Sequence, residues 1–194
     1  QYTRGIQEGN GTPADGNMWV TYSNNKEDMW VSRITVPVKT AATSHADTDF
    51  SAYSKLADMA DWNIYSPKWA PVALNGIWLK LSDKDPYDYA KVERMIPATK
   101  ELTVEFDVQA AQNGHGELDV EFVDAKGQAC SRIVLDSLGV MKVKGGPRFG
   151  TMLKNYKAGE TYRVKAILST DMHAGTYYIN DKKVCQRQFD TPVE

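Results

Sequence analysis

The chain has 194 residues, of which 42% are hydrophobic and 25% charged, so it can bury one sizeable core and does not have a disordered composition. Its 23 Lys and Arg residues against 25 Asp and Glu give a formal net charge of -2, without the basic excess that binds a phosphate backbone. Apolar runs are only a few residues long, far below the ~20 that a membrane helix needs. We therefore predict neither a nucleic-acid partner nor a membrane span.

The first forty residues contain two short strand-like runs, residues 18–22 and 29–36, joined by polar turn residues. Pro37 lies in the linker that follows, which predicts a β-hairpin separate from the sheets downstream. In the polar stretch after this linker, residues 50–59 either form one short helix or lie extended over the next domain. We predict a hairpin segment with its linker over residues 1–40, and one further domain over residues 41–194.

Strand patterns dominate the rest of the chain. The clearest are residues 100–110 and 116–124, in which apolar and polar side chains alternate, and the turn-rich link between them predicts a hairpin. Further strand-like runs, separated by turn residues, cover residues 77–82, 89–96, 128–136, 140–144, 149–154, 161–169, 176–180 and 183–189. This spacing predicts an all-β fold, a two-sheet antiparallel β-sandwich of jelly-roll type.

The alternation also predicts which side chains fill the core of this sandwich. They are Leu102, Val104, Phe106, Leu118, Val120, Phe122, Val164 and Leu168. Cys130 and Cys185 lie in strand-like runs without a Cys-x-x-Cys or Cys/His cluster, which excludes a zinc site through sulfur. Two small buried side chains are the preferred interpretation of the cysteines, and a disulfide between them stays open.

Residues 9–11, 17–23 and 25–34 form a recognisable pattern, in which Ser23, Asp28 and Trp30 resemble a degenerate Asp-box that lacks the turn glycine. On these residues the N-terminal segment resembles the last blade of bacterial sialidase-like β-propellers. Residues 60–65, with the run Leu79-x-Leu81-x-Asp83, Tyr162-x-Val164 and residues 177–182, resemble the concanavalin A/laminin G-like sandwich that some Bacteroidetes glycan-degrading enzymes carry after such a propeller.

This resemblance implies the C-terminal part of a larger carbohydrate-active protein that is secreted, periplasmic or on the cell surface. Its implied ligand is a polysaccharide or oligosaccharide. A non-catalytic, glycan-binding or supporting sandwich is the leading functional hypothesis. A laminin G-like protein-adhesion module is an alternative supported by the predicted fold alone.

A second alternative makes the sandwich itself a glycoside hydrolase. Glu117, Asp119 and Glu121 project from one face of a predicted strand. They resemble the Glu-x-Asp-x-Glu strand of retaining endo-β-glucanases, which implies Glu117 as nucleophile, Glu121 as acid/base and Asp119 as the residue that tunes both. Retaining hydrolysis needs two carboxyl groups about 5–5.5 Å apart. The preferred interpretation is a polar face, solvated or paired with Lys and Arg, in a segment that is not catalytic.

Aromatic residues between positions 62 and 89 are the candidates for stacking on a sugar. Trp78 is the first choice, with Tyr87 and Tyr89, because it alternates with the apolar positions 77, 79 and 81 and is predicted to face away from the core. Trp62 and Trp69 are predicted to clamp the N-terminal segment instead. Arg94 is a candidate partner for an acidic sugar, as are Arg132 and Arg148.

Calcium is the one cofactor that the sequence raises. Asp83, Asp85 and Asp88 crowd one loop and supply oxygen ligands, but their spacing does not fit an EF-hand. A plain turn around Pro86 is the preferred interpretation. His45, His115 and His173 have no partner at metal-ligand spacing, so the leading prediction is a domain without metal or cofactor.

Overall fold

The computed structural model describes residues 4–7, 17–24, 28–35, 38–85, 88–125, 127–145 and 150–189. Contacts within the chain divide it into two units, Gln1–Pro97 and Ala98–Glu194. The contacts thus group residues 41–97 with the first forty residues, whereas the predicted domain boundary after residue 40 stays a prediction. Pro37, Tyr87 and Arg148 lie outside the described residues.

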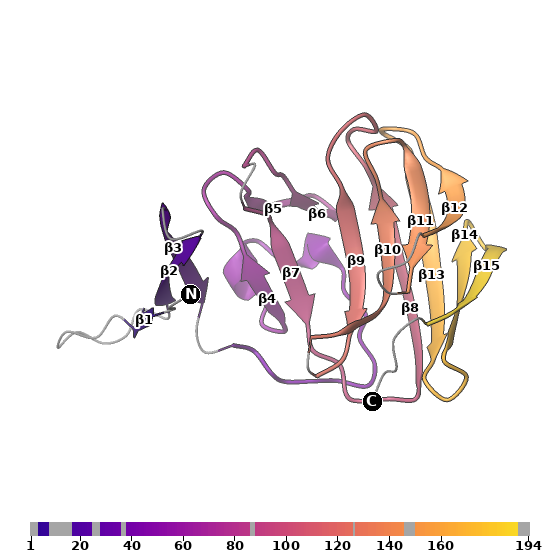
Figure 1. Cartoon of the computed structure of the whole chain (residues 1–194), viewed down its shortest axis with the longest axis horizontal. Helices are drawn as coiled ribbons and strands as arrows, with labels where there is room; N and C mark the ends of the chain where they lie inside the picture. Colours follow the sequence, from indigo (N-terminus) through magenta and orange to yellow (C-terminus); the bar gives the residue numbers. More distant parts are fainter. Residues whose placement is uncertain are drawn as a thin grey trace. The chain divides into compact units, whose positions relative to one another are not determined.

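The first unit begins with a three-stranded antiparallel sheet in the order β1-β2-β3 (Figure 1). Its strands are β1 (Arg4–Gln7), β2 (Asn17–Asn24) and β3 (Asp28–Thr35). β2 and β3 pair along their whole length, so the predicted hairpin, separate from the sandwich sheets, is confirmed. The strand β1 was not predicted, because its four residues are too few to show an alternation of apolar and polar side chains.

The remainder of the first unit consists of short elements. Residues 50–59, for which one short helix was considered, contain two short 3-10 helices, η1 (Phe50–Ala52) and η2 (Leu56–Asp58). The strands form two antiparallel pairs, β4 (Trp62–Tyr65) with β7 (Lys91–Arg94) and β5 (Val72–Asn75) with β6 (Trp78–Leu81).

A two-residue turn joins β5 to β6, because Asn75 pairs with Trp78. Gly76 has a φ of +62° there, a conformation that glycine adopts without the steric penalty of a Cβ atom. Ile77 also lies in the turn and is 66% exposed, so its predicted core position is wrong. The strand therefore begins one residue later than the alternation indicated.

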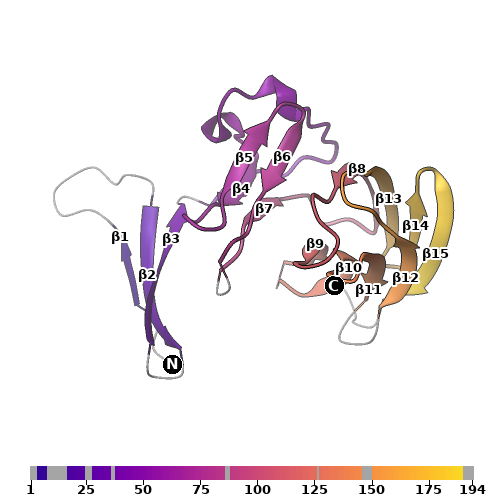
Figure 2. The same ribbon diagram turned by 90° about the horizontal axis from the view of Figure 1, so that it is seen from above.

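The second unit is a sandwich of two four-stranded antiparallel sheets, which Figure 2 shows as two layers. The strand orders are β12-β11-β10-β9 and β15-β14-β13-β8, which confirms the predicted all-β, antiparallel sandwich. The strands are β8 (Glu101–Gln109), β9 (Leu118–Val123), β10 (Ala129–Leu135), β11 (Val140–Lys144), β12 (Thr151–Asn155), β13 (Thr161–Ser169), β14 (Ala174–Ile179) and β15 (Lys182–Gln188). Among the described residues, no helix is long and apolar enough to cross a membrane.

The predicted hairpin between residues 100–110 and 116–124 is wrong. β8 pairs along its full length with β13, and β9 pairs with β10, so the two strands belong to different sheets. Both are edge strands, and residues 110–117 carry the chain from one sheet to the other. The turn residues correctly predicted that the chain reverses direction after β8. The reversal leads into the opposite sheet, however, where the apolar face of β9 packs against the same core as that of β8.

The core lies between the inner faces of the two sheets. Its most deeply buried residues come from the central strands and include Ile133, Leu135, Met141, Val143, Val164, Ala166, Leu168, Tyr177 and Ile179. Leu102, Phe106, Leu118, Val120 and Phe122 pack against this cluster but are only partly buried. Half-buried Val104 was predicted to share the core and does not belong to the cluster. Edge strands have a neighbour on one side only, which explains the weaker burial on β8 and β9.

The two cysteines are free thiols. Cys130 is buried in β10, where its Sγ donates to the carbonyl of Phe122 at 3.4 Å, and Cys185 is half-buried against the core. Burial raises the pKa of both thiols. The interpretation as small buried side chains is confirmed for Cys130, whereas Cys185 is only half-buried.

Candidate functional site

Trp78 and Tyr89, two of the predicted sugar-stacking residues, lie on different elements of the first unit. Trp78 is half-buried in β6, but Leu79 and Leu81 are half-buried as well, so the contrast between faces that singled out Trp78 is weak. Tyr89 is 58% exposed, and its ring centroid lies 5.9 Å from that of Tyr65. A ligand-binding role for Trp78 and Tyr89 stays a prediction.

Trp69 is exposed, in contrast to the clamping role predicted for it. Its side chain is 59% exposed, whereas Trp19, Trp62 and Trp78 are half-buried. The Nζ of Lys68 lies over the indole, 4.8 Å from the ring centroid. A tryptophan that clamps another segment would be covered by it, so the predicted clamp is wrong for Trp69.

The backbone around Trp69 is nevertheless firmly held. Ala70 and Val72 are buried on its C-terminal side. The N–H of Ala70 donates to the carbonyl of Pro67 at 3.2 Å, and the N–H of Val72 donates to Oγ of Ser66 at 2.8 Å. Trp69 therefore stands on an ordered turn with buried neighbours.

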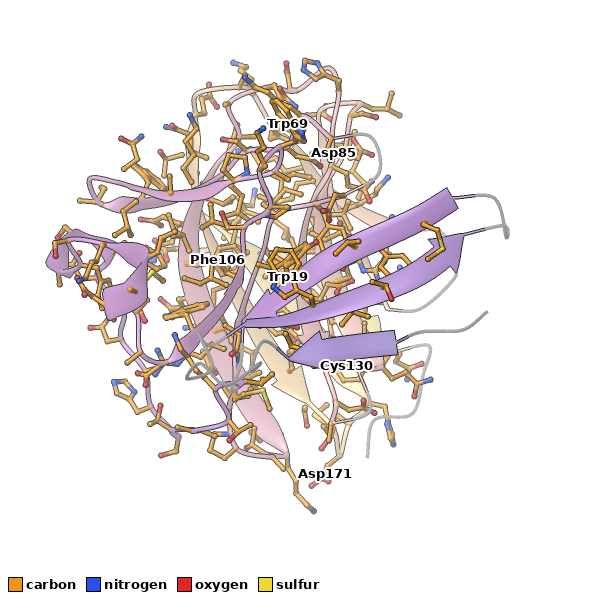
Figure 3. The ribbon with its side chains drawn as sticks, turned by 90° about the vertical axis from the view of Figure 1, so that its left-hand side faces the viewer. Trp19, Trp69, Asp85, Phe106, Cys130 and Asp171 are labelled. Carbon is orange, nitrogen blue, oxygen red and sulfur yellow. The ribbon has the colours of Figure 1, made fainter. Side chains whose placement is uncertain are left out.

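Charged residues after β6 lie alongside this turn. The N–H of Lys84 donates to the carbonyl of Trp69 at 2.9 Å, which brings residues 82–85 beside residues 66–71. The N–H of Asp85 donates to Oδ1 of Asp83 at 2.8 Å, and Figure 3 shows Trp69 and Asp85 at the same edge of the first unit. We call residues 66–71 and 82–85 together the Trp69 turn.

Arg94 holds the first unit together. Its guanidinium lies 3.1 Å from Oδ2 of Asp61, 3.2 Å from Oγ1 of Thr43 and 3.4 Å from Oγ1 of Thr48. It also lies over the ring of Trp62, 5.8 Å from the centroid, and the side chain is only 14% exposed. These contacts give Arg94 a structural role, and its role toward an acidic sugar stays a prediction.

Trp62 packs on the polar segment that precedes β4, and the predicted clamp on the N-terminal segment stays a prediction for this residue. It is half-buried in β4, and its ring centroid lies 6.0 Å from that of Phe50. Because Phe50 opens η1, this contact fixes the polar segment before β4.

The three aspartates suggested as calcium ligands serve separate hydrogen bonds. Oδ1 of Asp83 accepts from the N–H of Asp85, while Asp88 accepts from the hydroxyl of Tyr65 at 2.9 Å and from the N–H of Tyr89 at 2.9 Å. Within the described residues, no group of three or more His, Cys, Asp or Glu side chains could hold a metal ion. These contacts give no support to the calcium candidate, which stays a prediction.

The carboxylate row on β9 faces cations from the neighbouring strands. Arg132 on β10 forms ion pairs with Glu121 and with Asp119, whose Oδ2 lies 3.4 Å from the arginine Nε. Nζ of Lys144 on β11 lies 3.8 Å from Oε1 of Glu117, which precedes the strand. The expected pairing with Lys and Arg is confirmed.

Asp119 has the least favourable environment in this row. Burial raises its pKa, the negative charge of Glu117 adds to the rise, and Arg132 and Lys144 oppose it. Oδ1 of Asp119 and Nε of Arg132 are both buried without a hydrogen-bond partner. The role implied by the endo-β-glucanase resemblance, with Glu117 and Glu121 as nucleophile and acid/base, has no support from these contacts, since each glutamate faces a cation.

Comparison with known proteins gives two findings. Residues 62–194 match the model of a family described as "Sialidase-like, CBM domain". A solved structure of a Bacteroides protein named "Sialidase" superposes with a TM-score of 0.81 at 56% sequence identity. The match covers 100% of this chain and 18% of that one, so the chain spans less than a fifth of its neighbour. The search of curated proteins found no match.

Proposed function

Because the chain belongs to the family of sialidase-like CBM domains, we propose that it is a glycan-binding accessory domain of a larger carbohydrate-active protein. The family match over residues 62–194 carries this proposal. A CBM is a carbohydrate-binding module, a domain that holds a glycan while other residues of the protein carry out catalysis.

The chemistry of the first unit supports glycan binding. Aromatic side chains bury the apolar faces of sugar rings, and the matched region contains exposed Trp69 and exposed Tyr89. In the second unit, by contrast, the carboxylates of β9 are paired with cations and offer no arrangement that favours hydrolysis. A binding role fits both observations.

We extend the proposal to the parent protein. The solved neighbour is named "Sialidase" and is much longer than this chain, and residues 17–34 resemble a propeller blade. The parent then carries a sialidase-like propeller and acts on polysaccharides or oligosaccharides in a secreted, periplasmic or cell-surface setting. A concanavalin A-like or laminin G-like relationship of the sandwich belongs to the same proposal.

Affinity electrophoresis tests the binding function directly. The purified chain is run through gels that contain mucin, desialylated mucin, galactomannan or mixed-linkage β-glucan, with serum albumin as the non-binding reference. We expect retardation by at least one of these glycans and its relief by free oligosaccharide of the same type. Migration identical to that of albumin in every gel would contradict the proposal.

A further inference from the structure

We propose that the Trp69 turn is the surface on which this domain stacks a neutral pyranose ring. The inference rests on the proposed glycan-binding function and assigns its place in the fold. Trp69 supplies the apolar platform, and the charged residues that flank it supply hydrogen bonds to the hydroxyl groups of the sugar.

The first argument is the exposure of the indole. At 59% exposed, Trp69 presents an aromatic face to solvent, and such a face can bury the apolar face of a sugar ring. Here Lys68 precedes the indole, and the backbone hydrogen bond of Lys84 brings Asp83, Lys84 and Asp85 beside the same turn. An apolar face surrounded by donors and acceptors matches a pyranose, which has an apolar face and a polar edge.

The second argument is that the platform is already in place. The backbone hydrogen bonds of Ala70, Val72 and Lys84 hold the turn on both sides of the indole. Tryptophan has only two side-chain torsions, so little conformational freedom is lost when a ligand stacks on it. The ammonium of Lys68 is exposed and its contact with the ring is of the weak, solvent-exposed kind, so a sugar can displace it.

The third argument concerns the charge of the ligand. The two lysines and two aspartates of the turn balance, so the turn carries no net charge to attract an anion. Lysine ammonium groups donate to hydroxyls and aspartate carboxylates accept from them, which suits a neutral sugar. An acidic sugar would meet two carboxylates as well as two ammonium groups, so the turn offers it no net electrostatic attraction.

The other described aromatic residues of the matched region are less suited to this role. Trp62 is engaged by Arg94 and Phe50, and Trp78 is half-buried in β6. The ring of Tyr89 packs at a tilt on that of Tyr65. Tyr89 is about as exposed as Trp69, but its smaller ring already packs on Tyr65, so Trp69 offers the larger platform.

The test compares variants of the full chain on the glycan that retains the wild type. Trp69→Ala should weaken binding about tenfold or more, as expected where one aromatic side chain supplies much of the contact, and Trp69→Phe should recover part of the loss. Met172→Ala, which removes a 65% exposed apolar side chain from the second unit, is the matched control and should bind like the wild type. Circular dichroism should be unchanged in all three, because none of these side chains is buried.

The possible results separate the inference from the proposed function. Retention of Trp69→Ala equal to that of the wild type would overturn the Trp69 turn as the site and leave glycan binding intact. Retention that requires sialylated mucin and disappears on desialylated mucin and both neutral polysaccharides would overturn the neutral ligand. Wild-type chain that migrates like albumin in every gel would overturn both.

Discussion

The hydroxyl groups of Tyr177 and Ser131 form a buried hydrogen bond that joins the two sheets of the second unit. Tyr177 on β14 and Ser131 on β10 are each 1% exposed, and their oxygens lie 2.7 Å apart. Removing one partner leaves the other buried and unsatisfied, which costs about 1–3 kcal/mol, whereas removing both together can be nearly neutral. We expect Tyr177→Phe and Ser131→Ala each to lower the free energy of unfolding by about 1–2 kcal/mol, and the double variant by clearly less than their sum.

The same pair predicts how stability changes in alkali. Burial raises the pKa of Tyr177 from 10.0 to about 12, although the hydrogen bond from Ser131 opposes the rise. Below pH 10 the tyrosine is neutral in both folded and unfolded chains, and its contribution to stability is complete. As pH rises from about 10 to 12 the unfolded chain ionises first, so stability falls by up to ~3 kcal/mol. Tyr177→Phe should lose less stability than the wild type over this range.

The assay is urea unfolding followed by the circular dichroism of the β-sheets. All five tryptophans lie between residues 1 and 97, so tryptophan emission reports the first unit and would miss the second. Additive effects of Tyr177→Phe and Ser131→Ala would refute the interaction between the hydroxyls. Equal alkaline losses in wild type and Tyr177→Phe would refute the burial argument.

Three further substitutions test other contacts. Asp136→Ala removes a buried carboxylate that pairs with Lys142 at 2.5 Å and should cost about 2–4 kcal/mol in urea unfolding, with Asp136→Asn costing less. Burial tends to raise the pKa of Asp136, but hydrogen bonds from Lys142 and from backbone N–H groups lower it overall. The stabilisation by the Asp136 carboxylate is therefore complete above pH 3.8 and is lost as the pH falls through the folded-state pKa. Phe106→Ala should lower the free energy of unfolding by about 2–3 kcal/mol, less than for a fully buried phenylalanine, because Phe106 is only partly buried. A loss below about 1 kcal/mol would contradict its packing against the core. Arg94→Ala should speed hydrogen exchange over residues 38–49, and unchanged exchange there would show that the contacts with Thr43 and Thr48 do not hold this segment.

The strands were predictable because alternation is a local property of the sequence. The run from Leu102 to Val108 shows its buried face in the residue order alone, and β8 follows it closely. Strand pairing depends on residues far apart in the chain: β8 pairs with β13 some sixty positions later. The link after β8 contains turn residues in either topology, so the sequence could not distinguish a hairpin from a crossing between sheets.

The candidate site was harder to predict because exposure is decided by tertiary contacts. Trp78 was predicted to bind sugar because it alternates with apolar residues along the strand. Ile77 lies in the turn, however, and β6 is too short to show one buried and one exposed face. Trp69 lies between two prolines, which the sequence analysis connected with clamping. The sequence does not show the hydrogen bond from Lys84 that brings a charged segment beside residue 69, nor that the indole is 59% exposed.

The carboxylate row of Glu117, Asp119 and Glu121 allows experiments that distinguish a binding domain from a hydrolase. The raised pKa of Asp119, caused first by its burial, means that its charge lowers stability as pH rises through that pKa. Asp119→Asn should therefore be neutral or stabilising by up to about 1 kcal/mol, since the gain from removing a buried charge is offset by the lost pairing with Arg132. Thermal unfolding at neutral pH measures this change.

The same row makes a prediction about activity. Glu117 and Glu121 each face a cation, so we expect the purified chain to release no reducing ends from mixed-linkage or β-1,3-glucan. Both glutamates are exposed, so Glu117→Gln and Glu121→Gln should fold normally and serve as matched variants. Glucan turnover by the wild type that disappears in each variant would make this chain an enzyme, because two carboxyl groups that act as nucleophile and acid/base are each indispensable. Turnover that persists in both variants would come from another source and would leave the binding function as proposed.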